Sequence, residues 1–169
     1  MFGLFRKKPV DESVMIYPWI LDKAYEVFPQ RFARDTTTKP ERISRFEAIS
    51  AVAAATMWYL QQHNRKELVQ NLHDVMFDDF DAALREQGVG DLKVGKEIKK
   101  LAGAFYGRLE AYTPAFENQD TTMLQEAMNR NHALEKDEDH AHILQEIMAL
   151  AHPGKTADSW LEGFARKAS

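Results

Sequence analysis

The chain of 169 residues is long enough to bury one hydrophobic core and falls within the usual size range of a single domain. Hydrophobic residues make up 44% and charged residues 28%, a composition typical of a folded soluble protein and not of a disordered one. The net charge of −4 argues against DNA or RNA binding, and the lack of cysteine excludes disulfides, thiol catalysis and iron–sulfur clusters.

The first ten residues are predicted to be a flexible terminus that is both apolar and basic. Their apolar residues precede their charges, the reverse of a secretory signal, and the sequence contains no apolar run of about 18 residues that would predict a membrane span. We therefore expect a cytoplasmic protein. The terminus could touch an anionic membrane surface, or it could simply be frayed. The candidate contacts are Phe2, Leu4, Phe5, Arg6, Lys7 and Lys8.

Helical periodicity begins in residues 11–29, where Pro18 predicts either a kink or the start of a new helix. Residues 29–39 read as a polar connection. Thr38 then has the position of a helix cap, and a helix is expected over about 39–63. The segment from Ala48 to Leu60 is apolar on almost every side, which predicts a helix that is buried all round.

A third helix is predicted for residues 66–87, with a C-terminal stop at Gly88. Asp74, Asp78 and Asp81 lie on its outer side, where they favour solubility or a basic partner. Asp79 falls among the apolar positions, so its carboxylate needs a hydrogen-bonding or cationic partner unless it lies at the rim.

A long helix follows, with Asp91 as its predicted N-cap and Pro114 as its predicted kink or end. Gly103, Gly107 and Ala111 line up on the side away from its apolar stripe, which favours close approach by another backbone, although a tolerated glycine is the alternative. Two such faces predict a central helix. The stripe consists of Val94, Ile98, Leu101, Ala102, Phe105, Leu109, Tyr112 and Phe116.

The last third of the chain predicts three further elements. Asp120 is a good N-cap for a helix that ends before the charged joint 135–139. Apolar residues at helical spacing continue over 140–151, and a short helix is expected over 157–167. No segment shows strand alternation with hairpin turns. The fold class is therefore predicted to be all-α, a single-domain bundle of about six to seven helices.

No phosphate loop, nucleophile elbow or paired-histidine zinc motif occurs in the chain, so neither an enzyme nor a bound cofactor is expected. One alternative is a metal- or haem-binding protein. If the helix continued through the joint, His132, Glu135, Asp139 and His142 would share one face and offer two imidazoles and two carboxylates. Salt bridges on a solvated helix surface explain the same residues.

The junction before the long helix resembles the signature of the ubiquinol–cytochrome c chaperone family. The resemblance covers Asp81–Leu101, with its Leu-Arg-Glu-Gln-Gly-Val-Gly-Asp-Leu run, and Ala104–Tyr112, with Tyr-Gly-Arg-Leu-Glu-Ala-Tyr. Arg45-Phe46-Glu47 and residues 127–131 resemble two further family positions. Residues 32–40 depart from the family, because only Asp35-Thr36 remains of its Gly-Val-Pro-Asp-Thr loop.

The resemblance implies a helical, non-enzymatic assembly factor. Mitochondrial members help newly made cytochrome b enter the cytochrome bc1 complex, together with a small partner subunit beside the ribosome. The resemblance therefore implies that this chain acts in the cytoplasm at the inner membrane, with a core signature over about 66–116 and C-terminal helices over 120–168 in one domain, residues 11–169. A membrane scaffold anchored by residues 2–8 is a compatible third interpretation.

The resemblance also implies a set of partner-binding residues. They are Asp81, Arg85, Glu86, Gly88, Gly90, Asp91, Tyr106, Gly107, Arg108 and Tyr112. Each has a structural explanation as well. Gly88 and Gly90 can turn the chain, Tyr112 can belong to the core, and Asp81 can pair with Arg85 one turn later.

Overall fold

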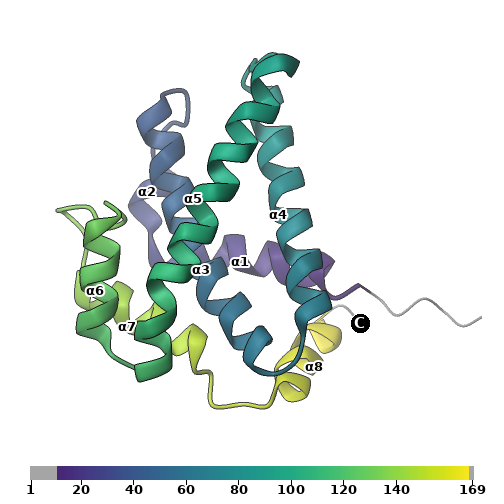
Figure 1. Cartoon of the computed structure of the whole chain (residues 1–169), viewed down its shortest axis with the longest axis vertical. Coiled ribbons are helices and arrows are strands. Elements are labelled where there is room, and N and C mark those ends of the chain that lie inside the picture. The colour runs from purple at the N-terminus through teal and green to yellow at the C-terminus, as the bar shows by residue number, and fades with distance from the viewer. Residues whose placement is uncertain (1–10, 168–169) are drawn as a thin grey trace, which may run out of the picture.

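Eight helices and no strands make up residues 11–167, the part of the chain that the computed structural model describes (Figure 1). The predicted all-α fold is confirmed. The predicted membrane contacts at residues 2–8 lie outside the described residues. The helices are α1 (Ser13–Val27), α2 (Pro29–Ala33), α3 (Lys39–Gln62), α4 (Lys66–Glu86), α5 (Asp91–Asn118), α6 (Thr121–Arg130), α7 (His140–Ala151) and α8 (Ala157–Lys167).

The N-terminal third differs from the prediction in two places. Residues 29–33 form the short helix α2 where a polar connection was expected, because Pro29 stands in the first turn, where a helix tolerates proline. α1 runs through Pro18 without a new start. Thr38 caps α3 as predicted, and its hydroxyl accepts a hydrogen bond from the Glu41 backbone N–H at 3.4 Å.

The central helix of the bundle is α3. Every residue from Ala48 to Leu60 is buried, as the apolar character of that segment predicts. α1, α2, α4, α5 and α7 all pack against it. Small alanines make up much of this segment, so neighbouring helices can approach on several sides. The central position in the bundle, which we predicted for α5, is therefore occupied by α3.

The apolar stripe of α5 is buried or half-buried as predicted, but its glycine side is open. Gly103 and Gly107 are exposed, and a Cβ atom built on either one would have no neighbour within 4 Å. The predicted close approach of another backbone is therefore wrong within the described chain. α3, α4 and α6, the neighbours of α5, leave this face uncovered.

The turn from α4 to α5 begins at Gly88, whose φ of +83° suits glycine. Its backbone N–H donates to Arg85, and that of Val89 donates to Leu84, each at 3.0 Å, so α4 ends in a Schellman motif. The predicted cap residue Asp91 is instead the first residue of α5, and Gly90 takes the cap position without a side-chain bond.

α5 continues past Pro114 to Asn118. Of the two predicted alternatives, a kink or an end of the helix after Tyr112, the end is therefore wrong. Proline removes one backbone donor, whereas Ala115 and Phe116 just beyond it are fully buried and hold the last turn against the core. Asp120 then caps α6 as predicted, and its carboxylate accepts from the Met123 backbone N–H at 3.0 Å.

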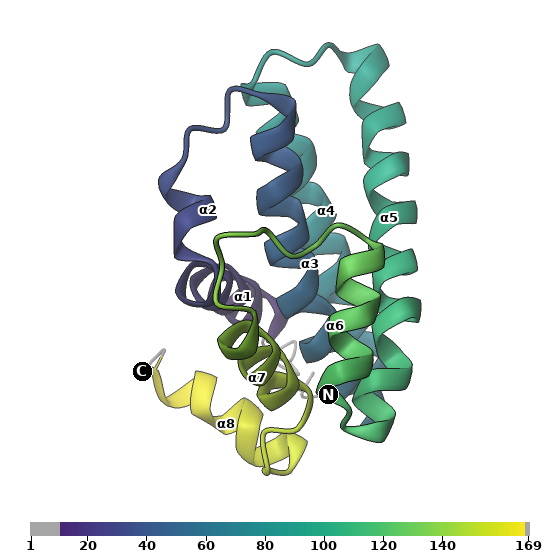
Figure 2. The ribbon, with the colours of Figure 1, turned by 90° about the vertical axis from the view of Figure 1, so that its left-hand side faces the viewer.

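α4 and α5 form an antiparallel pair whose connecting turn lies at one end of the long axis, while α8 lies at the other end (Figures 1 and 2). α6 lies beside the C-terminal half of α5 in both views, so the N-terminal half of α5 extends past it. Within residues 11–167 no helix has the length and apolar character that crossing a bilayer requires.

Candidate functional site

Three sequence stretches that carry the family resemblance meet between α3, α5 and the end of α6. Arg108 donates two hydrogen bonds to the carboxylate of Glu47, at 2.9 and 2.6 Å, and a third to the side-chain oxygen of Asn131 at 3.0 Å. Glu47 is only 5% exposed. A bidentate pair with a third bond satisfies a buried charge well, so this contact fixes α5 against α3 and the end of α6.

The contact between Arg108 and Glu47 stabilises the charged forms of both side chains. The hydrogen bond to Glu47 raises the pKa of Arg108, so the guanidinium stays charged. One turn later Tyr112 is fully buried, and burial, together with the charge of Glu47, raises the pKa of its phenol. Its hydroxyl has no hydrogen-bond partner among the described residues. Arg108 and Tyr112 therefore have a structural role: Arg108 joins α5 to α3, and Tyr112 packs in the core.

Tyr106, in contrast, faces outward and is 51% exposed. Its ring stacks on His73 of α4, with centroids 5.2 Å apart and planes 28° from parallel. His73 also contacts Phe77, which is buried, so the outward ring of Tyr106 rests on an aromatic support. Gly107 beside it is exposed as well. Of the predicted site residues on α5 beyond its first residue, Asp91, these two are available at the surface of the helix.

A groove of about 460 Å³ runs between α3 and α5, and Tyr106 stands on its wall. The groove combines aromatic, aliphatic and amide side chains with two carboxylates. Its lining residues are Trp58, Gln61, Gln62, Tyr106, Leu109, Glu110, Thr113 and Glu117. This is the candidate functional site, because here a residue of the family signature meets an open concave surface.

Sequence reasoning missed the α3 side of this groove. It placed Trp58 in the buried segment, and Trp58 is indeed 8% exposed, but the ring also lines the groove. The change from apolar residues to Gln61 and Gln62 at the end of α3 was the available signal, since it marks where the helix leaves the core.

The remaining predicted site residues gather at the α4–α5 turn. Arg85 donates to Asp81 at 2.6 Å and also pairs with Asp91, so it joins the two helices across the turn. The hydrogen bond to Asp81 is the largest cause that raises the pKa of Arg85. Glu86, Gly88 and Gly90 are exposed around this cluster. Asp91 and Tyr106 are 15 helical steps apart on α5, about 22 Å along the axis, so the predicted residues do not form one continuous site.

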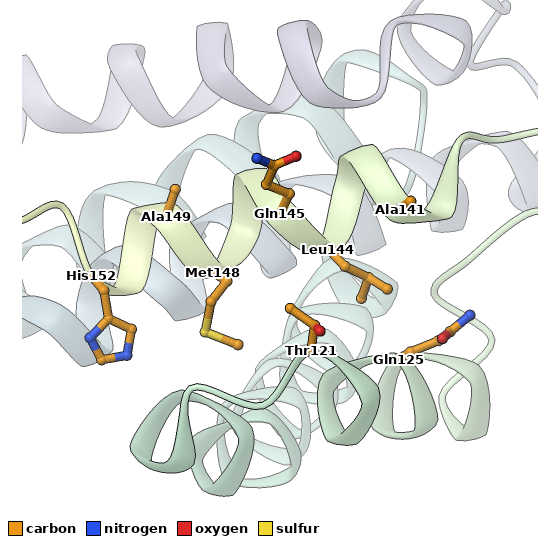
Figure 3. Close-up of a pocket in the computed structure, with 8 residues that line it drawn as sticks. All are labelled: Thr121, Gln125, Ala141, Leu144, Gln145, Met148, Ala149 and His152. Atoms are coloured by element: carbon orange, nitrogen blue, oxygen red, sulfur yellow. The ribbon is translucent and has the colours of Figure 1, made fainter.

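A second groove, of about 600 Å³, lies between α6 and α7 (Figure 3). Leu144 and Met148 point from α7 toward α6, where Thr121 faces them. None of the predicted partner-binding residues lines it. The complete lining is Thr121, Gln125, Ala141, Leu144, Gln145, Met148, Ala149 and His152.

The face required by the metal- or haem-binding alternative does not form. The helix breaks after Arg130, and exposed His132 adopts a left-handed φ of 54°. Glu135 is held by Arg34 at 2.8 Å and by the Ser44 hydroxyl at 2.5 Å. Asp139 caps α7 instead. Across the described range 11–167, no three or more histidine, aspartate or glutamate side chains are grouped so as to hold a metal ion.

Buried Arg31 holds the segment between α6 and α7, a contact that no sequence pattern predicted. It is 1% exposed and donates to both carboxylate oxygens of Glu138, at 2.6 and 2.7 Å, and to the carbonyl of Ala133 at 2.7 Å. Asp79, whose carboxylate was predicted to need a partner, accepts a hydrogen bond from Tyr17 at 2.7 Å. Both contacts join residues that are far apart in the sequence.

Comparisons with known proteins agree with the resemblance seen in the sequence. The family model described as "Ubiquinol-cytochrome C chaperone" matches residues 40–159. Among solved structures, the chain is similar to the crystal structure of the Cbp3 homolog from Brucella abortus, with 28% identity and a TM-score of 0.65. That match covers 90% of this chain and 86% of the other. A search of the curated proteins finds no match.

Proposed function

Because the chain belongs to the ubiquinol–cytochrome C chaperone family, we propose that it holds an immature membrane subunit of ubiquinol–cytochrome c reductase during assembly. The client in this proposal is cytochrome b. The protein acts by binding and not by catalysis, which accords with the lack of catalytic motifs in its sequence. It works on the cytoplasmic side, at the periphery of the inner membrane, together with a small partner subunit.

The observation that carries this proposal is the position of Tyr106 in the groove between α3 and α5. The neighbouring signature residue Arg108 fixes α5 through Glu47, while Tyr106 is half exposed on the groove wall. The family signature thus includes both a residue that fixes the wall and a residue that the wall presents. A role in client contact explains why an aromatic ring is held outward on a rigid support.

The chemistry of the groove suits a segment of an unassembled membrane protein. Trp58, Tyr106 and Leu109 offer apolar surface, and Gln61 and Gln62 offer amide groups that can pair with polar atoms of the client. A helix that would otherwise expose its apolar side to water gains from covering such a groove. No reacting group is needed for this task.

The other signature residues receive two different roles in the proposal. Arg108 and Tyr112 position the groove wall from within the core. Asp81, Arg85 and Asp91, with the exposed residues between them, present a polar surface at the α4–α5 turn. We assign this surface to the small partner subunit, because it lies at the end of the molecule, away from the groove.

Deleting the gene and measuring haem-loaded cytochrome b in membranes tests the function. The proposal predicts loss of the cytochrome b absorbance and of assembled reductase, with recovery when the wild-type gene is returned. The level of an unrelated membrane oxidase serves as the control and should stay constant. Unchanged cytochrome b and reductase in the deletion strain would contradict the proposal.

A further inference from the structure

The outward face of α5 is basic over its N-terminal half. At about 100° per residue, seven residues between positions 92 and 107 fall within about 60° of Lys96. All seven are exposed, and they lie opposite the apolar stripe that faces the core. We call them the lysine face. They are Leu92, Lys93, Lys96, Lys99, Lys100, Gly103 and Gly107.

The lysine face carries positive charge that the described chain does not neutralise. Lys93, Lys96 and Lys99 form no ion pair with any residue of the range 11–167. Lys100 has one exposed contact, at 3.3 Å, with Glu97, which lies at the edge of this face. At the nearby turn, Asp81 and Asp91 are paired with Arg85, and exposed Glu86 is the one acid of the turn without an ion pair in the range 11–167. Three unpaired ammonium groups, with Lys100 in a solvent-exposed contact as the fourth, are therefore available to an anionic surface.

Leu92 gives this basic face an apolar contact. It is 98% exposed, the highest value among the large hydrophobic residues of the described chain. Neither groove described above includes a residue between 91 and 105. At Gly103 and Gly107 no side chain projects from the helix. An exposed helix face outside both grooves that combines lysines with a leucine matches a bilayer interface better than it matches a small ligand, which needs a pocket.

The location of the face leaves it free to meet a flat surface. The N-terminal half of α5 extends past α6, and the α4–α5 turn lies at one end of the long axis (Figures 1 and 2). Gly103 and Gly107 lack any neighbour within 4 Å of an added Cβ, so no described helix covers this side. From Leu92 to Gly107 the face is about 22 Å long, enough to touch several lipid headgroups.

We infer that the lysine face binds the surface of a bilayer containing anionic phospholipids. The four ammonium groups lie against headgroup phosphates, and Leu92 enters the interface. The contact is peripheral, and it uses residues other than the groove and the N-terminal positions 2–8. Vesicle binding needs no client, so this inference and the proposed function can fail independently.

Cosedimentation of the full-length protein with lipid vesicles tests the inference. Vesicles of phosphatidylcholine mixed with phosphatidylglycerol should bind the protein, and vesicles of phosphatidylcholine alone should not. Binding should weaken as salt is added, because the attraction is between charges at the surface. Failure of the wild-type protein to bind the mixed vesicles would overturn the inference.

A matched pair of variants locates the contact. Changing Lys93, Lys96, Lys99 and Lys100 to Gln should reduce the partition by roughly several hundredfold, since each lysine contributes about fivefold at an anionic surface. The control changes Lys39, Lys66, Lys136 and Lys155 to Gln; these lysines are also exposed, and the loss of charge is the same. Circular dichroism should show both variants folded, because glutamine is a good helix former.

Four results separate the inference from its competitors. Loss of binding in the lysine-face variant with binding kept in the control supports it. Leu92→Ser should by itself weaken binding by about tenfold, as expected for an apolar side chain withdrawn from the interface. Equal loss in both lysine variants overturns the inference, because general charge would then account for binding. Loss only on removing residues 1–10 also overturns it and assigns the contact to the terminus.

Discussion

The guanidinium of Arg108 forms a bidentate ion pair with the carboxylate of Glu47, with contacts of 2.9 and 2.6 Å across 61 residues of sequence. The pair joins α5 to the central helix α3 at the point where the buried segment of α3 begins. Residues 45–47 and 104–112, two stretches of the family resemblance, are thereby joined. Their contact fixes the α5 wall of the groove, from which Tyr106 projects.

Replacing Arg108 with Met should strongly destabilise the fold. Glu47 is 5% exposed and would lose its cation, and breaking a buried pair by removing one partner costs about 3–5 kcal/mol. Because Arg108 itself is 18% exposed, we expect a value near the lower end, about 3 kcal/mol. Urea denaturation followed by circular dichroism measures the change in the free energy of unfolding.

The exposed arginine of the α4–α5 turn provides the comparison. Arg85→Met also removes an arginine with two carboxylate partners, but these contacts lie in solvent and should matter far less for stability. If the two variants lose similar stability, the buried network does not have the structural role assigned to it.

The stability of the protein should depend on the charge of Glu135. Burial alone would raise the pKa of this carboxyl, but hydrogen bonds from Ser44 and Arg34 and the charges of Arg31 and Arg34 hold the pKa below its ordinary 4.5. A lowered folded-state pKa stabilises the fold above pH 4.5, and this contribution is lost as the pH falls through the lower value.

Glu135→Gln isolates this contribution. As the pH falls below 4.5, the free energy of unfolding of the wild type should decrease more steeply than that of the variant, because the variant lacks the titrating group. Chemical denaturation at a series of pH values measures both curves. The other carboxylates titrate in both proteins, so parallel curves would show that Glu135 does not contribute.

The open glycine side of α5 predicts that alanine is tolerated there. Gly107→Ala should raise the free energy of unfolding by about 0.5–1 kcal/mol, since glycine costs that much in a helix interior and the new methyl group meets nothing. Gly88→Ala should have the opposite sign and cost about 1 kcal/mol, because φ is +83° at that position. Thermal and urea unfolding of the two variants test the contrast. A destabilised Gly107→Ala protein would mean that something in the full chain packs against this face.

Signals confined to a few neighbouring residues predicted the fold well. Thr38 and Asp120 act as caps where the sequence placed them, because a cap depends only on the three or four residues that follow it. Gly88 ends its helix for a similarly local reason. The apolar stripe of α5 was readable because burial follows helical periodicity.

Features that depend on distant residues could not be read in the same way. Arg31 and Glu138 meet across 107 residues, so no spacing rule connects them. α5 continues through Pro114 because burial of Phe116 outweighs one missing hydrogen bond. Gly103 and Gly107 suggested a neighbour, but small residues show only that a helix could approach. The groove could not be predicted either, because it forms only where the end of α3 packs beside α5 in the tertiary structure.

Capture of newly made cytochrome b by tagged protein from detergent-solubilised membranes tests the central claim most directly. The comparison uses the wild type, Tyr106→Ala and Tyr25→Ala. Tyr25 is a matched control on α1, since it is 57% exposed against 51% for Tyr106 and lies outside the groove. Both variants should remain folded, because each loses only a half-exposed ring.

The account predicts that wild type and Tyr25→Ala retain cytochrome b while Tyr106→Ala loses roughly tenfold or more of it, as for removal of an aromatic anchor worth about 2 kcal/mol. Equal recovery of cytochrome b with all three proteins would contradict the assignment of the groove. Absence of cytochrome b from the wild-type capture would contradict the proposed client itself.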